Sequence, residues 1–127
     1  AQVRARAAQP GIQVHGYVPD ITPYMDGARV AVAPLRFGAG VKGKVNLSMA
    51  HGQPVVATMC AAEGMHLRDG VDVALADDAA AFAQAVVALY TDGDRWQRQA
   101  RAGLENVARH FSFEAAAATV DRVFLEP

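Results

Sequence analysis

Residues 30–58, with the sequence VAVAPLRFGAGVKGKVNLSMAHGQPVVAT, constrain the fold of this chain more than any other stretch. An apolar strand leads into a loop rich in glycine and lysine, which opens a helix and is followed by a second apolar strand. Such a loop gathers backbone N–H groups, Lys42 and Lys44 around a helix N-terminus. We therefore expect the loop to bind an anion, above all a phosphate.

Four short segments have the composition of β-strands. They are bounded by Gly or Pro, rich in β-branched residues and apolar on both faces where they are longest, as expected for a parallel sheet covered by helices. The predicted strands are residues 11–16, 29–34, 54–58 and 71–76.

Helical patterns separate these strands and fill the C-terminal third. One helix is predicted over about residues 20–27 with Asp20 as N-cap, and another over about residues 41–52. Gly93 is expected to end the first helix of the C-terminal third. The N-caps predicted for the three C-terminal helices are Asp77 or Asp78, Asp94 and Ser112. The sequence thus predicts one α/β domain over residues 1–127, with its strands first and a helical tail after them.

Composition excludes several classes of protein. Twelve basic and thirteen acidic residues give a net charge of −1, which provides no electrostatic footprint for nucleic acid or an anionic membrane surface. The single cysteine, Cys60, excludes an intrachain disulfide and a cysteine-based zinc cluster, and it fits a reducing compartment. The histidines are too scattered for a metal-ligand spacing, and no apolar run reaches the roughly 20 residues that span a bilayer.

Two nucleotide-binding motifs match the loop in part. Gly38, Gly40 and Gly43 satisfy the G-x-G-x-x-G dinucleotide fingerprint, but the first glycine does not directly follow the strand, and Glu63 lies beyond the tip of the next strand. The triphosphate P-loop G-x-x-x-x-G-K-[ST] also nearly fits, but Val45 holds its last position and has no hydroxyl for Mg²⁺. An NAD-binding domain and a P-loop are therefore the less favoured alternatives.

A longer pattern resembles a known family. The string APLRFGAGVKGKVNLSMAHGQPVVAT, followed by AAEGMHL, resembles the C-terminal domain of GT-B glycosyltransferases of the large "group 1" family (family 4-like). In that family a strand ending in proline leads through a glycine-rich loop into a helix reading roughly K-x-x-E-A-M-A-x-G-x-P-V-V-A-T. The positions in register are Lys44, Met49, Ala50, Gly52 and residues 54–58. HGYVPDITPYMDGARVAVAP upstream, and DGVDVALADDAAAFAQAVVALYTD and RHFSFE downstream, extend the match over nearly the whole chain.

The resemblance implies a Rossmann-like parallel sheet flanked by helices, with a helical C-terminal tail. The chain would be most of the nucleotide-sugar-binding half of a GT-B enzyme, cut from a longer protein and lacking its first strand–helix unit. An N-terminal GT-B domain would hold the acceptor, so the isolated chain should be inactive. We also expect the exposed edge of the truncated sheet to allow self-association.

The intact enzyme implied by this resemblance is a hexosyltransferase in the cytoplasm, either free or peripheral to the membrane. It would transfer sugar from a nucleotide-diphosphate donor, UDP- or GDP-linked, with retention and without a metal or another cofactor. The lysines and loop amides would neutralise the diphosphate leaving group, as a divalent cation does elsewhere. The residues assigned to this diphosphate are Arg36, Gly38, Ala39, Gly40, Val41, Lys42 and Lys44.

Other site residues follow from register or position. Tyr17 and Val18 match the segment that lies against the nucleobase in the family, and Asn46 and Leu47 stand at the nucleobase and ribose position. Glu63 and His66 are candidates for the cleft because their loop follows the carboxyl end of a predicted strand, where ligands bind in such sheets. No catalytic residue can be assigned.

The chain departs from the family at two positions. The family commonly carries two glutamates separated by seven residues, and their places are taken here by Ala39 and Leu47. The second glutamate usually accepts hydrogen bonds from ribose hydroxyls, which leucine cannot do. Polar residues that could replace it are Lys44, Asn46, Ser48 and His51. A non-catalytic nucleotide-binding or interaction module on the same fold is therefore the alternative function.

Overall fold

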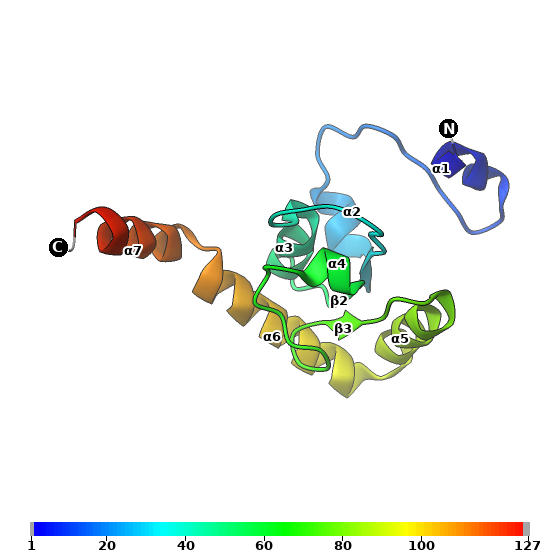
Figure 1. Ribbon diagram of the computed structural model, residues 1–127. Helices are drawn as coiled ribbons and strands as arrows, with labels where there is room; N and C mark the ends of the chain where they lie inside the picture. Colours follow the sequence, from blue (N-terminus) through cyan, green and yellow to red (C-terminus); the bar gives the residue numbers. More distant parts are fainter. Residues whose placement is uncertain (1, 126–127) are drawn as a thin grey trace.

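The centre of the computed structural model, which describes residues 2–125, is a three-stranded parallel sheet in the order β1–β2–β3 (Figure 1). The strands are β1 (Ala31–Ala33), β2 (Val55–Ala57) and β3 (Ala74–Leu75). Each lies inside a predicted strand, and the register places Val32 beside Val56 and Val56 beside Ala74. The predicted α/β class is therefore confirmed, and the carboxyl ends of all three strands meet at one edge of the sheet.

Helices connect and cover these strands. α2 leads into β1, α3 joins β1 to β2, α4 follows β2, and three longer helices form the C-terminal third. The helices are α1 (Gln2–Ala5), the 3₁₀ turn η1 (Arg6–Ala8), α2 (Thr22–Gly27), α3 (Gly43–Ala50), α4 (Met59–Ala62), α5 (Ala79–Thr91), α6 (Gly93–His110) and α7 (Phe113–Phe124). Within residues 2–125, no helix combines the length and apolarity needed to cross a bilayer.

The core lies on both faces of the sheet, as the two-sided apolar strands predict. On one face, Val45 and Met49 of α3 pack with Val55 and Ala57 of β2, and α6 closes this cluster. On the other face, Leu89 of α5 packs against the neighbouring strands. Burial on both faces leaves the strand ends as the accessible part of the sheet.

α6 ties the two ends of the sheet together. It begins near the amino ends of the strands and reaches the carboxyl edge with its last turn. Three of its side chains donate hydrogen bonds to backbone carbonyls of the sheet layer: Trp96 to Arg29, Gln99 to Val55 and Asn106 to Met65, at 2.6, 2.9 and 3.1 Å. The carbonyls of Arg29 and Met65 lie outside the strands, so two of these bonds satisfy acceptors that the strand ladder does not.

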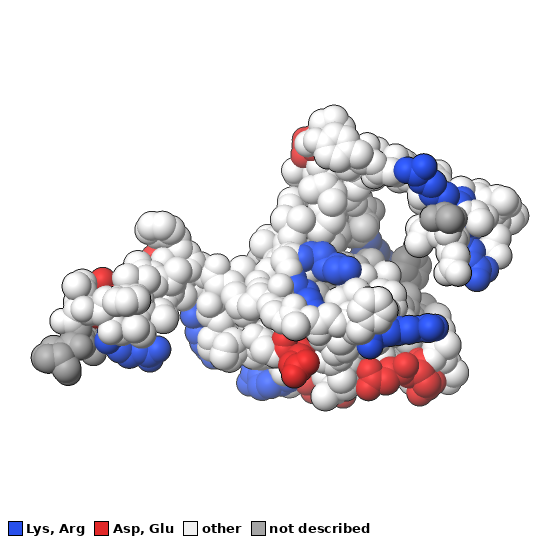
Figure 2. Space-filling model, turned by 45° about the horizontal axis from the view of Figure 1, so that its top comes forward, with Lys and Arg blue, Asp and Glu red and all other residues white. Residues whose placement is uncertain are grey.

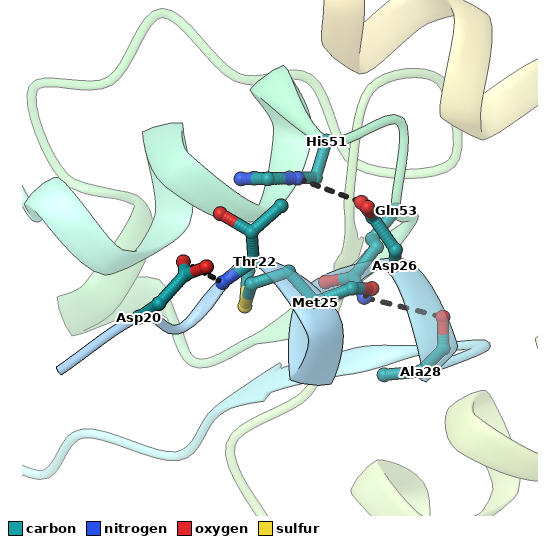
Figure 3. Close-up of polar contacts among 7 residues, drawn as sticks. All are labelled: Asp20, Thr22, Met25, Asp26, Ala28, His51 and Gln53. Atoms are coloured by element: carbon teal, nitrogen blue, oxygen red, sulfur yellow. Dashed lines mark hydrogen bonds and ion pairs between the residues drawn. The ribbon is translucent and has the colours of Figure 1, made fainter. Parts of the chain in front are cut away.

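Polar contacts hold α2 at the amino side of the sheet (Figure 3). In these contacts Asp20 accepts from the Thr22 amide at 2.9 Å, His51 lies 3.0 Å from Asp26, and Gln53 donates to the carbonyls of Met25 and Ala28. The Thr22 N–H holds the pKa of Asp20 below its usual 3.8. Asp20 therefore supports the start of α2, although Ile21 holds the N-cap position that was predicted for Asp20.

Two of the three N-caps predicted for the C-terminal third are confirmed by the structure. Asp78 and Ser112 are the N-caps of α5 and α7, as predicted. α6 begins two residues earlier than expected, because Asp92 accepts a hydrogen bond from the Arg95 amide at 3.0 Å and takes the capping role predicted for Asp94. Gly93 is therefore the first residue of α6, and the prediction that it ends the preceding helix is wrong, since α5 ends at Thr91.

The strand predicted over residues 11–16 is wrong. This part of the chain runs outside the sheet as an irregular segment between η1 and α2 (Figure 1). In the described residues β1 is an edge strand paired only with β2, so residues 11–16 do not pair with its free side. Apolar alternation does not form a strand without a paired neighbour, and Ile12 stays 41% exposed.

α7 projects from the rest of the molecule, beyond the last turn of α6 (Figure 1). None of its residues is buried, and Phe113 and Phe124 are 85% and 77% exposed. A helix of this length is marginal in water without tertiary packing. The core therefore gains little from α7.

Candidate functional site

Side-chain hydrogen bonds tie the loops at the carboxyl edge of the sheet to one another. The Thr58 hydroxyl, directly after β2, donates to the Leu35 carbonyl at 2.6 Å and accepts from the Ala61 amide at 3.3 Å. Asp77, after β3, accepts from the Met59 amide at 2.9 Å. The loop after β1 is thus held against the start of α4, and α4 against the loop after β3.

The glycine loop after β1 has a backbone that only glycine adopts freely at two positions. Gly38 and Gly40 have φ values of +143° and +74°. Lys42 closes this loop: its ammonium donates to the Gly40 carbonyl at 2.6 Å, and its amide donates to Met65 Sδ at 3.2 Å. With only 8% of its surface exposed, Lys42 supports the loop in this structure and contributes little exposed charge.

The start of α3 carries uncompensated positive charge. Its N-cap position is Lys42, which makes no side-chain cap, and its first turn contains no acidic residue. The amides of Val45 and Asn46 bond to the Lys42 carbonyl, but those of Gly43 and Lys44 meet no protein acceptor among the described residues. Free amides, the helix dipole and the exposed Lys44 side chain therefore converge at this point.

The residues predicted to contact a diphosphate differ in their exposure to solvent. Lys42 is buried, whereas the exposed members are Arg36, Gly38, Ala39, Gly40, Val41 and Lys44. On the face of the molecule shown in Figure 2, Lys and Arg side chains lie at separate places without forming one broad patch. A ligand at this loop would therefore meet a few local cations and backbone amides, with no extended basic surface.

The predicted nucleobase residues make no hydrogen bond or ring contact with the glycine loop in the described part of the chain. Tyr17 is 91% exposed and Val18 is half-buried in the irregular segment before α2. The nearest aromatic contact in this segment is between His15 and Tyr24, whose ring centroids lie 4.7 Å apart.

The polar residues around Leu47 have different environments. Ser48 donates to the Lys44 carbonyl at 2.9 Å, and His51 lies against Asp26 at the far end of α3. Asn46 Oδ1 is buried and accepts no hydrogen bond in the described structure. Leu47 itself is 40% exposed. Among these groups, Lys44 alone combines exposure with a place in the first turn of α3.

The two cleft candidates, Glu63 and His66, lie in different hollows. Glu63 borders a hollow of about 340 Å³ with Met59 and Cys60, beside α4. His66 lines another of about 440 Å³, between the segment after α4 and the C-terminal half of α6. The structure therefore does not bring the two side chains to one site.

His110 is a candidate that the sequence does not reveal. Its ring stacks on that of His66, with centroids 4.2 Å apart and planes 11° apart. Arg68 lies in the same hollow and makes a two-pronged contact with the buried Asp72 at 3.0 and 3.1 Å, which raises the pKa of Arg68. Among residues 2–125, no group of three or more His, Cys, Asp or Glu side chains is arranged to hold a metal ion.

A parallel sheet with a glycine loop and a lysine-bearing helix start at its carboxyl edge is typical of Rossmann-like ligand-binding domains. A model of the family described as glycosyl transferases group 1 matches residues 1–92, from the start of the chain through the end of α5. The chain therefore belongs to the glycosyl transferases group 1 family, which supports a glycosyltransferase-type function. A comparison with curated proteins found no match.

Proposed function

We propose that this chain binds the diphosphate of a nucleotide-sugar donor at the junction of the glycine loop and α3. The observation that carries the proposal is the start of α3, where Lys44 is exposed and the first turn contains no acidic residue. Gly38 and Gly40 let the loop backbone turn so that its amides lie beside this helix start. The matched family includes the whole of this segment.

The electrostatics of α3 favour an anionic ligand. A lysine in the first turn of a helix is unfavourable because it repels the positive end of the helix dipole. A bound diphosphate removes this repulsion and accepts hydrogen bonds from free amides and from Lys44. Each charge-assisted hydrogen bond would contribute about 1.5–3 kcal/mol. Arg36, exposed in the loop after β1, supplies a second cation at the same edge.

The role of this site in transfer would be to stabilise the leaving group. As the bond to the sugar breaks, negative charge develops on the diphosphate, and fixed cations and amides lower the cost of that charge. We further propose that the donor is UDP- or GDP-linked, that transfer retains the anomeric configuration without a metal, and that a separate domain holds the acceptor. These features rest on the family.

Ligand-detected NMR of the full chain with UDP, GDP, ADP, ATP and NAD tests the proposal. Lys44→Ala should weaken binding of the preferred nucleoside diphosphate by about 10–150-fold, the equivalent of one charge-assisted bond. Arg98→Ala is the matched control, because Arg98 is an exposed cation on α6 outside the glycine loop. Equal weakening by both variants, or a preference for NAD, would contradict the proposed site.

A second candidate function is a non-catalytic nucleotide-binding module. The observation in its favour is that Leu47, 40% exposed, presents an aliphatic side chain in the same helix as Lys44. Leucine cannot accept a hydrogen bond from a ribose hydroxyl. In the intact protein, Leu47→Glu should increase transfer if the site is a weakened enzyme. Strong transfer that the substitution leaves unchanged would exclude the non-catalytic module.

A further inference from the structure

The His66–His110 stack joins two parts of the chain that are far apart in sequence. His66 follows α4, and His110 is the last residue of α6. Their rings are nearly parallel, 11° apart, with centroids separated by 4.2 Å, and Phe111 lies at the edge of the cluster. Stacking at this distance is favourable for neutral rings, but two imidazolium ions would repel each other.

The backbone at His66 is held in a conformation that costs free energy. Its φ of +57° makes it the one non-glycine residue with positive φ among those described. Strained backbone of this kind persists only where the surrounding contacts maintain it. The ring stack with His110 is such a contact, so the segment after α4 has a reason to relax when the stack is lost.

The charges around the stack do not neutralise two protonated imidazoles. From the segment after α4, Arg68 and Asp72 line the same hollow, and they are paired with each other. From α6, Glu105 and Arg109 line it and bear opposite charges. The four charged neighbours therefore sum to zero, and neither histidine has a carboxylate to itself.

The surroundings of His110 lower the pKa of its imidazole. Desolvation first, and then the charges of His66 and Arg109, hold the pKa of His110 below its usual 6.5, with Asp72 opposing. The packed state therefore binds protons less readily than an open state in which His110 has an ordinary pKa. The packed state is fully favoured above pH 6.5 and loses stability as the pH falls below that value toward the lowered pKa.

We propose that the His66–His110 pair is a proton-operated latch between the segment after α4 and the end of α6. With neutral rings the latch is closed, and the segment packs on α6. When both imidazoles bind a proton, the stack separates and the segment moves away from α6. The conformational change is local, because Met65 belongs to a core cluster and Leu67 and Phe111 pack against it, which confines the movement to the two rings and the backbone at His66.

The latch is connected to the glycine loop through Met65, which directly precedes His66. The Met65 carbonyl accepts from Asn106 of α6, and its sulfur accepts from the Lys42 amide at the start of α3. Opening the latch thus weakens the contact that holds Lys42 in place. This effect on ligand affinity rests on the proposed function, whereas the latch itself does not.

Histidine NMR of the unsubstituted chain between pH 5 and 8 tests the latch directly. The ring signals of His66 and His110 should change together over the same pH range, because the two rings are stacked. Hydrogen exchange of the Lys42 and Met65 amides, corrected for the intrinsic pH dependence of exchange, should be faster at pH 5.5 than at pH 7.5, because the lowered pKa of His110 makes the closed state less stable as the pH falls. Independent titration of the two rings, or unchanged exchange, would overturn the proposal.

Two variants sharpen this test. His110→Phe keeps a flat ring against His66 but cannot bind a proton at this position, so it should remove the pH dependence of exchange. His15→Phe is the control, because His15, in the segment before α2, contacts Tyr24 of α2 and lies outside the latch. A His110→Phe chain that exchanges like the unsubstituted one at both pH values would contradict the latch.

Nucleotide binding separates the latch from the proposed function. UDP and GDP affinities are measured at pH 5.5 and 7.5 for the unsubstituted chain and for His110→Phe, so that protonation of the phosphate itself cancels. Coupled histidines without nucleotide binding would retain the latch and refute the donor site. Nucleotide binding that is lost in Lys44→Ala, together with independently titrating histidines, would retain the donor site and refute the latch.

Discussion

Thr58→Val should clearly destabilise the domain although the two side chains have nearly the same size, because the Thr58 hydroxyl joins two loops at the carboxyl edge. Valine keeps the shape of threonine but removes the donor to the Leu35 carbonyl at 2.6 Å and the acceptor of the Ala61 amide at 3.3 Å. Leaving a partly buried carbonyl unpaired costs about 1–3 kcal/mol, and losing an N-cap costs about 0.5–2 kcal/mol. Since the capping bond is long and α4 is short, we expect a total of about 2–3 kcal/mol.

Urea unfolding at pH 7, followed by fluorescence of the single Trp96, measures this loss. The midpoint should fall with an unchanged slope, which shows that stability has changed and the compactness of the unfolded state has not. Thr58→Ser is the matched control: it keeps the hydroxyl and loses one methyl group, at a cost of about 0.8 kcal/mol. If Thr58→Ser were as unstable as Thr58→Val, the hydrogen bonds would not be the cause.

Three further outcomes are expected. Leu89→Ala, in the fully buried core beneath α5, should cost about 2–5 kcal/mol in urea unfolding, whereas Val87→Ala, 59% exposed on the same helix, should change stability by less than about 0.5 kcal/mol. Deleting residues 113–127 should leave the thermal midpoint of the core nearly unchanged in calorimetry, because no described residue of α7 is buried; a large fall would show that α7 packs on the core. Asp20→Asn should reduce the loss of stability on acidification below pH 3.8, since the Thr22 amide lowers the pKa of Asp20 and the folded state favours its ionised form; an unchanged acid limb in urea unfolding from pH 3 to 5 would refute this role.

The parts of the fold that the sequence predicts are those with local causes. Two-sided apolar segments such as PVVAT fix buried strands, because few other structures bury every residue in a short run. Asp78 and Ser112 identify helix starts because a cap acts within three residues of itself. For α6, two acidic residues compete, and Asp92 prevails over Asp94 because its oxygen reaches the Arg95 amide.

The rest depends on contacts between distant residues. Residues 11–16 have the pattern of a strand, but a strand requires a paired neighbour. The sequence of the segment alone does not determine whether it has one. Lys42 is held by a contact with Met65, 23 residues away, and His66 stacks on His110 at the end of α6, and neither partner can be read from the local sequence. The glycine loop could be found from sequence, whereas which of its cations is exposed could not.

The three side-chain hydrogen bonds of α6 constrain the length of that helix. Trp96, Gln99 and Asn106 lie within one face of the helix and donate to carbonyls before β1, at the start of β2 and after α4. Inserting one residue between Gln99 and Asn106 would rotate the later turns by about 100° and advance them by about 1.5 Å, which separates Asn106 from its acceptor. α6 should therefore accept many substitutions on its exposed side while its length stays fixed, and insertions in homologous chains should avoid it.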